Sequence, residues 1–202
     1  MRSAEFDRDA VLVQAMETFR AHGYSKTTMQ QLVAATGLHP GSIYAAFGNK
    51  RGLFLAAIEH YVAERSRFRQ QMLTADPSPL ASLHHYLNLV AGEMVQGVCL
   101  VTRSLLELGE DADLRAQLAL IYHHMEHDFR AVLLRAQKLG EVPLERDIEV
   151  LTLYLMTGIQ GLVTVAKCHP ERETLHAVVA QLMGGLQAMP YVGAQVVLDA
   201  SQ

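Results

Sequence analysis

Several side chains between residues 30 and 50 can make the contacts by which proteins bind nucleic acid. Gln30 can form a bidentate pair of hydrogen bonds with an adenine base. The methyl groups of Ala45 and Ala46 can contact thymine methyl groups. Lys50 begins an expected helix, where its ammonium group and the backbone N–H groups can bind a phosphate. These residues are candidates for a nucleic-acid interface.

A second candidate group is the sequence HHMEH at residues 123–127. His123 and His127 are four residues apart and share a helical face, a spacing that can hold a metal ion. His84 and His85 on another expected helix could complete such a site. The interpretation we favour is that these histidines are exposed or line a pocket, so no metal ligand is assigned.

Cys99 is the third candidate, at the start of a short expected helix. A helix N-terminus lowers the pKa of a thiol and makes it more reactive, so Cys99 could sense oxidants or electrophiles. The favoured alternative is a buried, apolar cysteine. The chain has no glycine-rich phosphate loop, nucleophile elbow or paired-carboxylate motif. We therefore expect neither an enzyme nor a cofactor.

The first candidate group is positioned by two short expected helices joined by a tight turn. Thr28 precedes the first helix, and its hydroxyl can accept a hydrogen bond from a free N–H of the first turn. Gly37 ends this helix because glycine adopts left-handed backbone angles without a Cβ clash. The apolar positions Met29, Leu32 and Val33 have the spacing of one helical face.

The second helix begins at Pro40, whose missing N–H costs nothing in a first turn. Ile43 and Phe47 are expected to face inward. The residues at the entrance of this helix are His39, Pro40, Gly41 and Ser42. Two helices in this order form a helix-turn-helix, whose second helix lies in the major groove of DNA.

Over about residues 7–55 the chain resembles the DNA-binding domain of TetR-family transcriptional regulators. The matching residues are Gly23-Tyr24, Thr27-Thr28, Leu32-Val33, Gly37, Gly41, Ile43-Tyr44, Phe47 and Lys50-Arg51-Gly52-Leu53. Val33 and Thr36 depart from the commonest form, which has alanine at both positions. The resemblance implies that Lys50 contacts phosphate, and that the hydroxyls of Thr28 and Tyr44 add further phosphate contacts.

The charge distribution agrees with DNA binding by the N-terminal part alone. The 202-residue chain has a net charge of −4, but residues 1–55 carry +2 and the rest −6. Two distant cysteines suggest a reducing compartment. The N-terminal residues carry charges where a signal peptide would be apolar. We expect a cytoplasmic protein.

The expected fold is all-α, with about nine helices. An N-terminal three-helix helix-turn-helix domain at 1–55 is followed by a helical domain for ligand binding and dimerisation at 56–202. The expected helices beyond residue 49 cover 50–69, 80–94, 97–108, a long segment from Asp111 or Asp113 to 139, 145–167 and 171–188.

The apolar segment 148–166 could be mistaken for a membrane span, but it contains Glu149 and Gln160. We interpret it as a buried helix, in which Gly158 and Gly161 allow another helix to approach closely. The resemblance implies that the last two long helices form a four-helix bundle with a second copy, and hence a homodimer.

A ligand pocket is expected among the helices of the second domain. The residues expected to line it are Met94, Cys99, Leu105, Tyr122, Met125, Phe129 and Tyr154, with Leu87, Val90 and Met156 as further candidates. Each could instead be part of the core.

The sequence thus predicts a TetR-like regulator that binds a palindromic operator in double-stranded DNA as a dimer. We expect a repressor that is released by a small-molecule effector and has no membrane partner. The alternatives are a metal- or redox-sensing regulator, or a helical metal-binding protein that uses His123 and His127 or Cys99.

Overall fold

The computed structural model describes residues 6–95, 100, 101, 104 and 112–188, and within them it is helical with no strand. The helices are α1 (Arg8–His22), α2 (Met29–Thr36), α3 (Pro40–Phe47), α4 (Lys50–Leu73), α5 (Pro79–Met94), α7 (Ala112–Lys138), α8 (Ile148–Cys168) and α9 (Arg172–Gln187). These eight described helices confirm the expected all-α fold.

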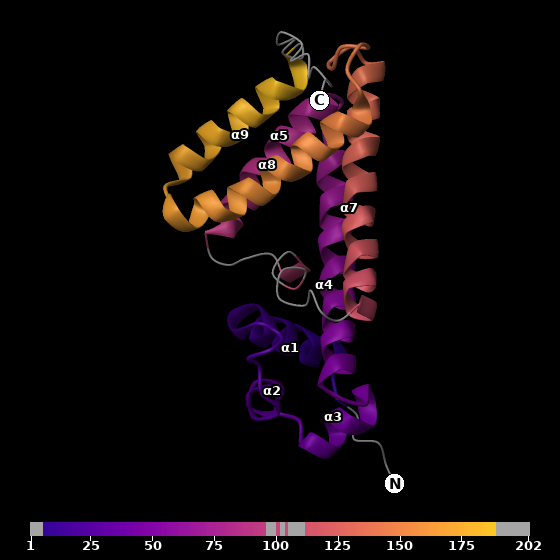
Figure 1. Cartoon of the computed structure of the whole chain (residues 1–202), viewed down its shortest axis with the longest axis vertical. Helices are drawn as coiled ribbons and strands as arrows, with labels where there is room; N and C mark the ends of the chain where they lie inside the picture. Colours follow the sequence, from indigo (N-terminus) through magenta and orange to yellow (C-terminus); the bar gives the residue numbers. More distant parts are fainter. Residues whose placement is uncertain (1–5, 96–99, 102–103, 105–111, 189–202) are drawn as a thin grey trace, which may run out of the picture.

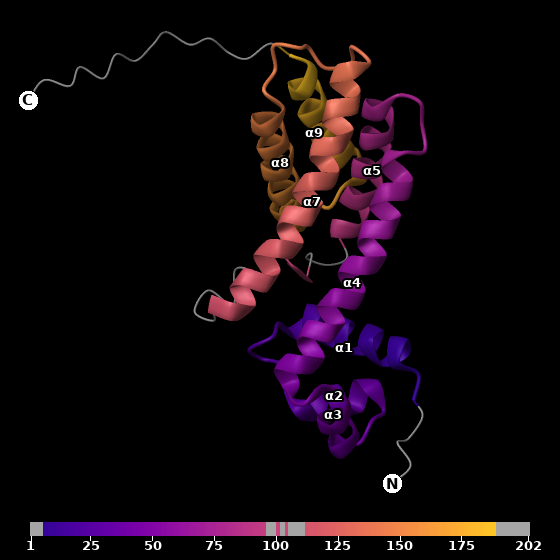
Figure 2. The ribbon, with the colours of Figure 1, turned by 90° about the vertical axis from the view of Figure 1, so that its right-hand side faces the viewer.

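The helices form two units connected by α4 (Figure 1). The first three helices gather around the N-terminal end of α4. The helix then continues into the second unit, where it meets α5 and α7. Figure 2 shows the same arrangement from the side, with α5, α8 and α9 packed together away from α1–α3, while the N-terminal part of α7 contributes Leu114 and Leu118 to the core of the first unit. The expected domain boundary after residue 55 therefore falls inside one continuous helix.

Polar side chains fix the starts of these helices. The side-chain amide oxygen of Asn49 accepts a hydrogen bond of 2.9 Å from the Gly52 N–H at the start of α4. Ser78 caps α5 by accepting from the Ala81 N–H at 3.1 Å. Gly140, with φ of 75°, follows the C-terminal end of α7, as the sequence predicts.

Three expected helix boundaries need correction. Helix α4 continues four residues beyond 69, to Leu73. Helix α8 begins at Ile148 rather than near 145, because Asp147 accepts hydrogen bonds from the N–H groups of Glu149 and Val150. Asp113 lies inside α7 rather than capping it. The expected helix at 97–108 and the alternative cap Asp111 lie outside the described residues or are covered only in part.

The core of the N-terminal unit is built around aromatic rings. Phe19 of α1 and Phe54 of α4 are fully buried, with ring centroids 5.0 Å apart in an edge-to-face arrangement. Tyr24 completes the cluster, 4.7 Å from the Phe54 ring. Leu32 of α2 and Ile43 of α3 are also fully buried in this core. The two motif helices are thereby held against α1 and α4.

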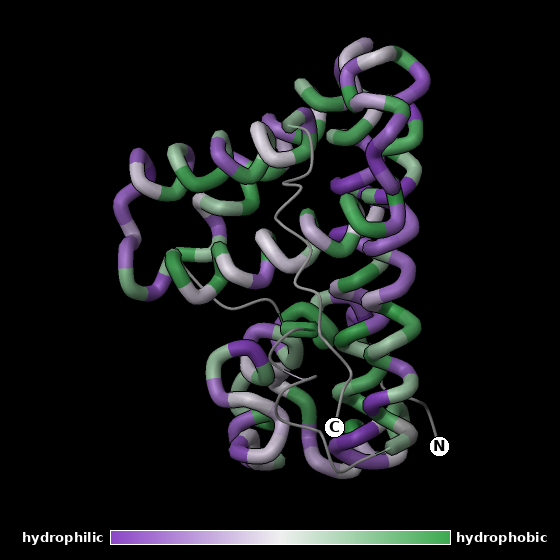
Figure 3. Tube along the Cα trace, turned by 45° about the horizontal axis from the view of Figure 1, so that its top comes forward, coloured by the Kyte–Doolittle hydropathy of each residue, from purple (hydrophilic) through white to green (hydrophobic). Residues whose placement is uncertain are grey.

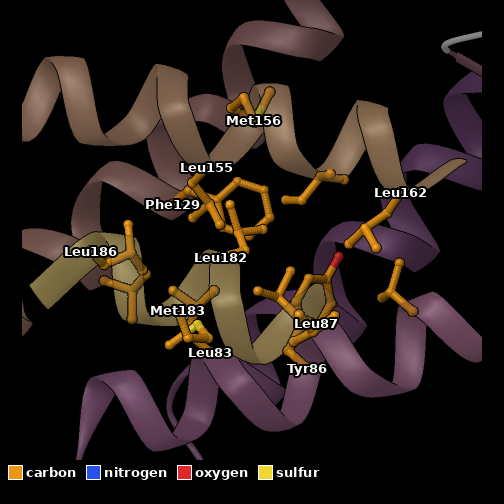
Figure 4. Packing of buried hydrophobic residues seen from close by; sticks show 14 of the residues in the cluster. Leu83, Tyr86, Leu87, Phe129, Leu155, Met156, Leu162, Leu182, Met183 and Leu186 are labelled. Carbon is orange, nitrogen blue, oxygen red and sulfur yellow. The ribbon is translucent and has the colours of Figure 1, made fainter. Parts of the chain in front are cut away.

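The second unit has its own core, in which α5, α7, α8 and α9 contribute side chains (Figure 4). Hydropathy alternates along each helix, as expected for helices with one buried face (Figure 3). A Cβ atom at Gly158 would lie 2.4 Å from the Leu182 side chain, so glycine there allows α9 to approach α8. Among the described residues, a Cβ atom at Gly161 would have no neighbour within 4 Å.

Helix α8 is long and apolar enough to cross a membrane by length and composition alone. One face of it, which includes Leu151, Leu155 and Leu162, is buried against neighbouring helices. A helix in a protein core passes the same test, and this packing accounts for its apolar composition.

A buried ion pair connects α4 to α7. Arg69 is 5% exposed, and its Nε donates to Oδ2 of Asp128 at 2.8 Å. A second guanidinium nitrogen, Nη2, contacts the same oxygen. Farther along, Arg135 Nη1 donates to the backbone carbonyl of Leu73 at 3.1 Å. The C-terminal part of α4 is therefore attached to α7 by charge as well as by packing.

Asp128→Asn should lower the free energy of unfolding by about 3 kcal/mol, because it leaves the buried Arg69 charge without a counter-charge. Urea unfolding followed by circular dichroism measures this. Glu149→Gln is the matched control, since it breaks the exposed Arg130–Glu149 pair and should cost less than about 1 kcal/mol. Equal losses in the two variants would contradict the role given to the α4–α7 pair.

Candidate nucleic-acid interface and regulatory cavity

The start of α2 is fixed by a reciprocal capping box. The Thr28 hydroxyl accepts a hydrogen bond of 3.2 Å from the Gln31 N–H. In return, the Gln31 side-chain oxygen accepts one of 2.8 Å from the Thr28 N–H. The cap role predicted for Thr28 is confirmed, and Gln31 is the partner that the sequence reasoning missed, although threonine followed three residues later by glutamine is a known signal.

The turn between the motif helices depends on Gly37. Its φ of 69° lies in the left-handed region, and its N–H donates to the Val33 carbonyl at 3.0 Å. The chain then enters α3 at Pro40, with His39 as an N-cap that makes no side-chain hydrogen bond. The predicted helix-turn-helix geometry is confirmed.

Helix α3 has one face in the core and one face in solvent. Ile43 is fully buried, and Phe47 packs against the same cluster. On the other side Gly41, Ala45 and Ala46 are exposed, and Tyr44 is 49% exposed. The solvent face therefore consists of small side chains and one tyrosine, which lets another molecule approach the helix backbone closely.

The structure places every predicted DNA-contacting residue at or near the surface of this unit. The exposed ones are Thr28, Gln30, His39, Pro40, Gly41, Tyr44 and Ala45, and the half-buried ones are Ser42 and Lys50. They lie on α2, α3 and the first turn of α4, or directly before these helices. Their contacts with DNA stay predictions.

Gly41 has no steric explanation inside the chain. A Cβ atom built there meets no heavy atom within 4 Å. Glycine inside a helix costs about 0.5–1 kcal/mol relative to alanine. The open space beside Gly41 is on the solvent side of α3, where a close approach by DNA would use it.

Lys50 is held by the aromatic core of the unit. Its ammonium nitrogen lies 4.6 Å from the centre of the Tyr24 ring, a cation–π distance. Burial lowers the pKa of Lys50 from its ordinary value. Arg8 makes a similar contact with Phe47, at 4.7 Å. Arg8 lies on α1, outside the motif, and no sequence signal marked it.

A cavity of about 140 Å³ lies between α4, α5, α7 and α8. Met94, Tyr122, Met125 and Phe129 line it, together with Val90, so these predicted positions do come together. Leu87 and Met156 are buried in the core without lining it. Cys99 and Leu105 lie outside the described residues.

The prediction for Tyr154 is corrected by the structure. Tyr154 is 40% exposed and does not line the cavity. Its ring lies beside Gly185, where a Cβ atom would be 2.1 Å from the phenol oxygen. Its hydroxyl donates weakly to the Leu182 carbonyl at 3.4 Å. The side chain therefore packs outward across α9, because Gly185 leaves room for it there.

Polar side chains from α1 and α4 also reach the cavity, and the sequence reasoning missed them. Tyr61, Arg65 and Arg69 are four residues apart on α4, so they share one face. Arg20 of α1 lines the cavity as well. The spacing of these three residues on α4 was a usable signal in the sequence.

Ion pairs and hydrogen bonds organise this polar wall. Arg65 Nη1 lies 2.7 Å from Oε2 of Glu93 on α5. Burial lowers the pKa of Arg65, but the neighbouring Tyr61, Glu93 and Tyr86 outweigh burial and raise it overall. Burial and Glu126 raise the pKa of Tyr122, against a hydrogen bond with Gln160 that lowers it. The cavity wall thus holds Arg65 as a cation and Tyr122 as a neutral phenol.

The histidines of α7 do not form a metal cluster. His123 is exposed and its Nδ1 lies 2.9 Å from Oε2 of Glu126. His124 and His127 are also exposed. Among the described residues, no three His, Cys, Asp or Glu side chains are grouped so that they could hold a metal ion.

Comparison with protein-family models gives two matches. Residues 11–57 match the model for bacterial regulatory proteins of the tetR family. Residues 80–182 match the model for a tetracyclin repressor-like C-terminal domain. The two matches cover the helix-turn-helix unit and most of the second core.

Transcriptional regulators of bacteria and solved structures are similar over most of the chain. The repressor ComR of Escherichia coli (strain K12) is 30% identical over 167 residues, which is 80% of each chain. The uncharacterized regulator YezE of Bacillus subtilis (strain 168) is 29% identical over 86% of this chain and 93% of its own. A cysteine mutant of the TetR family regulator CifR, complexed with 26-bp operator DNA, is 31% identical with a TM-score of 0.82, covering 91% of this chain and 98% of that one.

Thr28→Ala should lower the free energy of unfolding by about 1 kcal/mol, because it removes the hydroxyl of the capping box. Thr28→Ser keeps a hydroxyl and should stay within about 0.5 kcal/mol of the parent. Urea unfolding of both variants measures the difference. If serine and alanine destabilise the protein equally, the hydroxyl does not cap α2.

Proposed function

The chain belongs to the TetR family and is a DNA-binding transcriptional regulator, and we propose that it is a homodimeric repressor that a small-molecule effector releases from a palindromic operator. The observation that carries this proposal is the exposed face of α3, presented by a rigid helix-turn-helix. The family assignment favours this function over that of a helical metal-binding protein. A cytoplasmic location follows from a DNA partner.

The proposed contacts with DNA are of two kinds: phosphate contacts that orient the protein and base contacts that recognise the sequence. Lys50 and the hydroxyls of Thr28 and Tyr44 would bind phosphates and set the orientation of the protein. Gln30, His39 and Ser42 would reach base edges. The small residues Gly41 and Ala45 would let α3 lie deep in the major groove, where Ala45 can meet a thymine methyl. The similar regulator CifR is complexed with operator DNA, which supports DNA binding as the function of this unit.

Repression is supported by the relatives. ComR is a transcriptional repressor, and it is similar over 80% of the chain. A protein of this size that covers one operator can block transcription by occupancy, without contacts to other proteins. We therefore propose repression rather than activation.

A second copy would cover the apolar side chains that α8 and α9 expose. Val150, Leu153 and Tyr154 on α8 are 61%, 54% and 40% exposed, and Val178 on α9 is 37% exposed. Their spacing on α8 places them on one face, which continues to the exposed Gly161. Pairing of this face with itself about a two-fold axis gives an isologous dimer. Two copies of α3 would then face successive major grooves.

The cavity gives an effector access to the helix that carries the DNA-binding unit. Its lining includes Tyr61, Val62, Arg65 and Arg69 of α4, and only two residues separate the end of α3 from the start of α4. An effector that binds better when α4 has moved would shift the dimer away from the DNA-binding geometry. It can do so only by as much as its affinities for the two states differ.

The purified protein should retard DNA from its own promoter, and its affinity should fall roughly 10³-fold between 50 and 200 mM salt. Ala45→Glu should weaken binding about 100-fold, because it sets a carboxylate against the DNA charge at a site exposed in the free protein. Ala81→Glu, at an exposed position of α5, is the control and should bind DNA normally. Fluorescence anisotropy measures the DNA affinity of the parent protein and of both variants. Unchanged binding by Ala45→Glu would contradict the placement of α3.

Leu153→Glu should dissociate the dimer, since it buries an unpaired charge in the proposed interface twice per assembly. Analytical ultracentrifugation should show a shift to monomer at micromolar concentration and at least a tenfold loss of operator affinity. Leu144→Glu, at a 78% exposed position outside α8, should remain dimeric. A Leu153→Glu variant that sediments as the parent does would exclude this interface.

A further inference from the structure

We infer that the effector of this protein is a small organic anion, one ring in size with a carboxylate group, and that it acts by replacing Glu93 as the partner of Arg65. This inference rests on the proposed function, because it names the chemistry and the switch of the same cavity. It follows from the size of the cavity, the charges on its wall and the exposure of one ion pair.

The size and the apolar part of the lining define the body of the ligand. An enclosed apolar cavity of about 150 Å³ holds a benzene molecule, and the volume here is about 140 Å³. One side of it is formed by aliphatic, thioether and aromatic side chains. These residues are Val90, Met94, Ile121, Met125, Phe129, Ile159 and Val163. A single aromatic or aliphatic ring fits this volume and this surface.

The charges on the opposite wall define the functional group. Arg20, Arg65 and Arg69 line the cavity, and Glu93 is the only acidic residue among its described lining residues. Glu17, the ion-pair partner of Arg20 at 3.1 Å, is outside that lining. A cationic ligand would meet three guanidinium groups, whereas a carboxylate can accept two parallel hydrogen bonds from one of them. The wall therefore favours an anion.

The two ion pairs of α4 differ in how easily they can exchange partners. In Arg65–Glu93 the side chains are 29% and 53% exposed, and in Arg69–Asp128 they are 6% and 14% exposed. Exposed pairs contribute little net stability, while breaking a buried pair is costly. A ligand carboxylate can thus displace Glu93 from Arg65, but it leaves the Arg69–Asp128 pair intact.

This exchange would change how α4 is held. The Arg65–Glu93 pair connects α4 to α5, and the Arg69–Asp128 pair connects α4 to α7 near its C-terminal end. Loss of the first connection removes an ion pair that holds α4 against α5, while the second connection keeps the C-terminal end of α4 against α7. Arg20 of α1 lines the same cavity, so the anion also contacts the DNA-binding unit directly. Binding is thereby coupled to the position of α3.

The test uses the full-length dimer with sodium benzoate as the probe and benzamide as its uncharged counterpart. Isothermal titration calorimetry measures binding, and fluorescence anisotropy measures release from promoter DNA. Benzoate should bind at least about tenfold more tightly than benzamide, a difference of about 1.4 kcal/mol, and should weaken DNA binding at least fivefold. Equal binding of the acid and the amide, or no binding of benzoate, would overturn the inference.

Two substitutions separate the proposed exchange from a structural effect. Arg65→Gln should reduce benzoate binding at least tenfold. Glu93→Gln removes the competing carboxylate and should tighten benzoate binding several-fold, which a merely structural role of Glu93 would not do. Arg130→Gln, in an exposed pair that does not line the cavity, is the control. Unchanged or weaker benzoate binding by Glu93→Gln would overturn the exchange. Failure of the ligand-free parent to bind promoter DNA would instead overturn the proposed function.

Discussion

The structure depends on α4 belonging to both cores at once. Phe54, Ala57 and Ile58 of this helix are fully buried in the N-terminal unit, and Leu73 is buried in the second core. Helix α4 has no proline inside it, and sharp kinks in helices occur mostly at proline, Gly/Ser pairs or bulges. A displacement of α4 relative to α5 would therefore be transmitted to α1, α2 and α3, which pack around its N-terminal part. The buried pair between Arg69 and Asp128 fixes the end about which such a displacement would occur.

The two units differ in structure and in the role proposed for each. The N-terminal unit is rigid, because the aromatic cluster of Phe19, Tyr24 and Phe54 ties α1 to α4 and holds the motif helices. The second unit contains the cavity, and α4 forms one of its walls. A ligand that binds at the cavity wall can then alter the position of α3 without disturbing the structure of the helix-turn-helix itself.

The sequence predicted the features that short-range chemistry determines. Thr28, Gly37 and Pro40 act through their own backbone neighbours, so the motif could be located from residue types and spacing. Glycine and proline breaks located the helices of the second domain in the same way. The outward packing of Tyr154 across Gly185 and the meeting of Arg20 with Arg65 in one cavity depend on which helices become neighbours. The start of α8 was placed near residue 145, although Asp147 is a preferred N-cap residue type and its hydrogen bonds set the start of the helix at Ile148.

Operator binding by the dimer requires that two copies of α3 face one side of a DNA duplex at a fixed separation. A spin label at Ala46→Cys, in a chain with Cys99→Ser and Cys168→Ser, allows the distance between the two labels of a dimer to be measured by pulsed electron resonance. On promoter DNA the account predicts one narrow distance distribution near the spacing of successive major grooves, about 34–36 Å. Absence of a dipolar distance, or a broad distribution that DNA does not change, would contradict it.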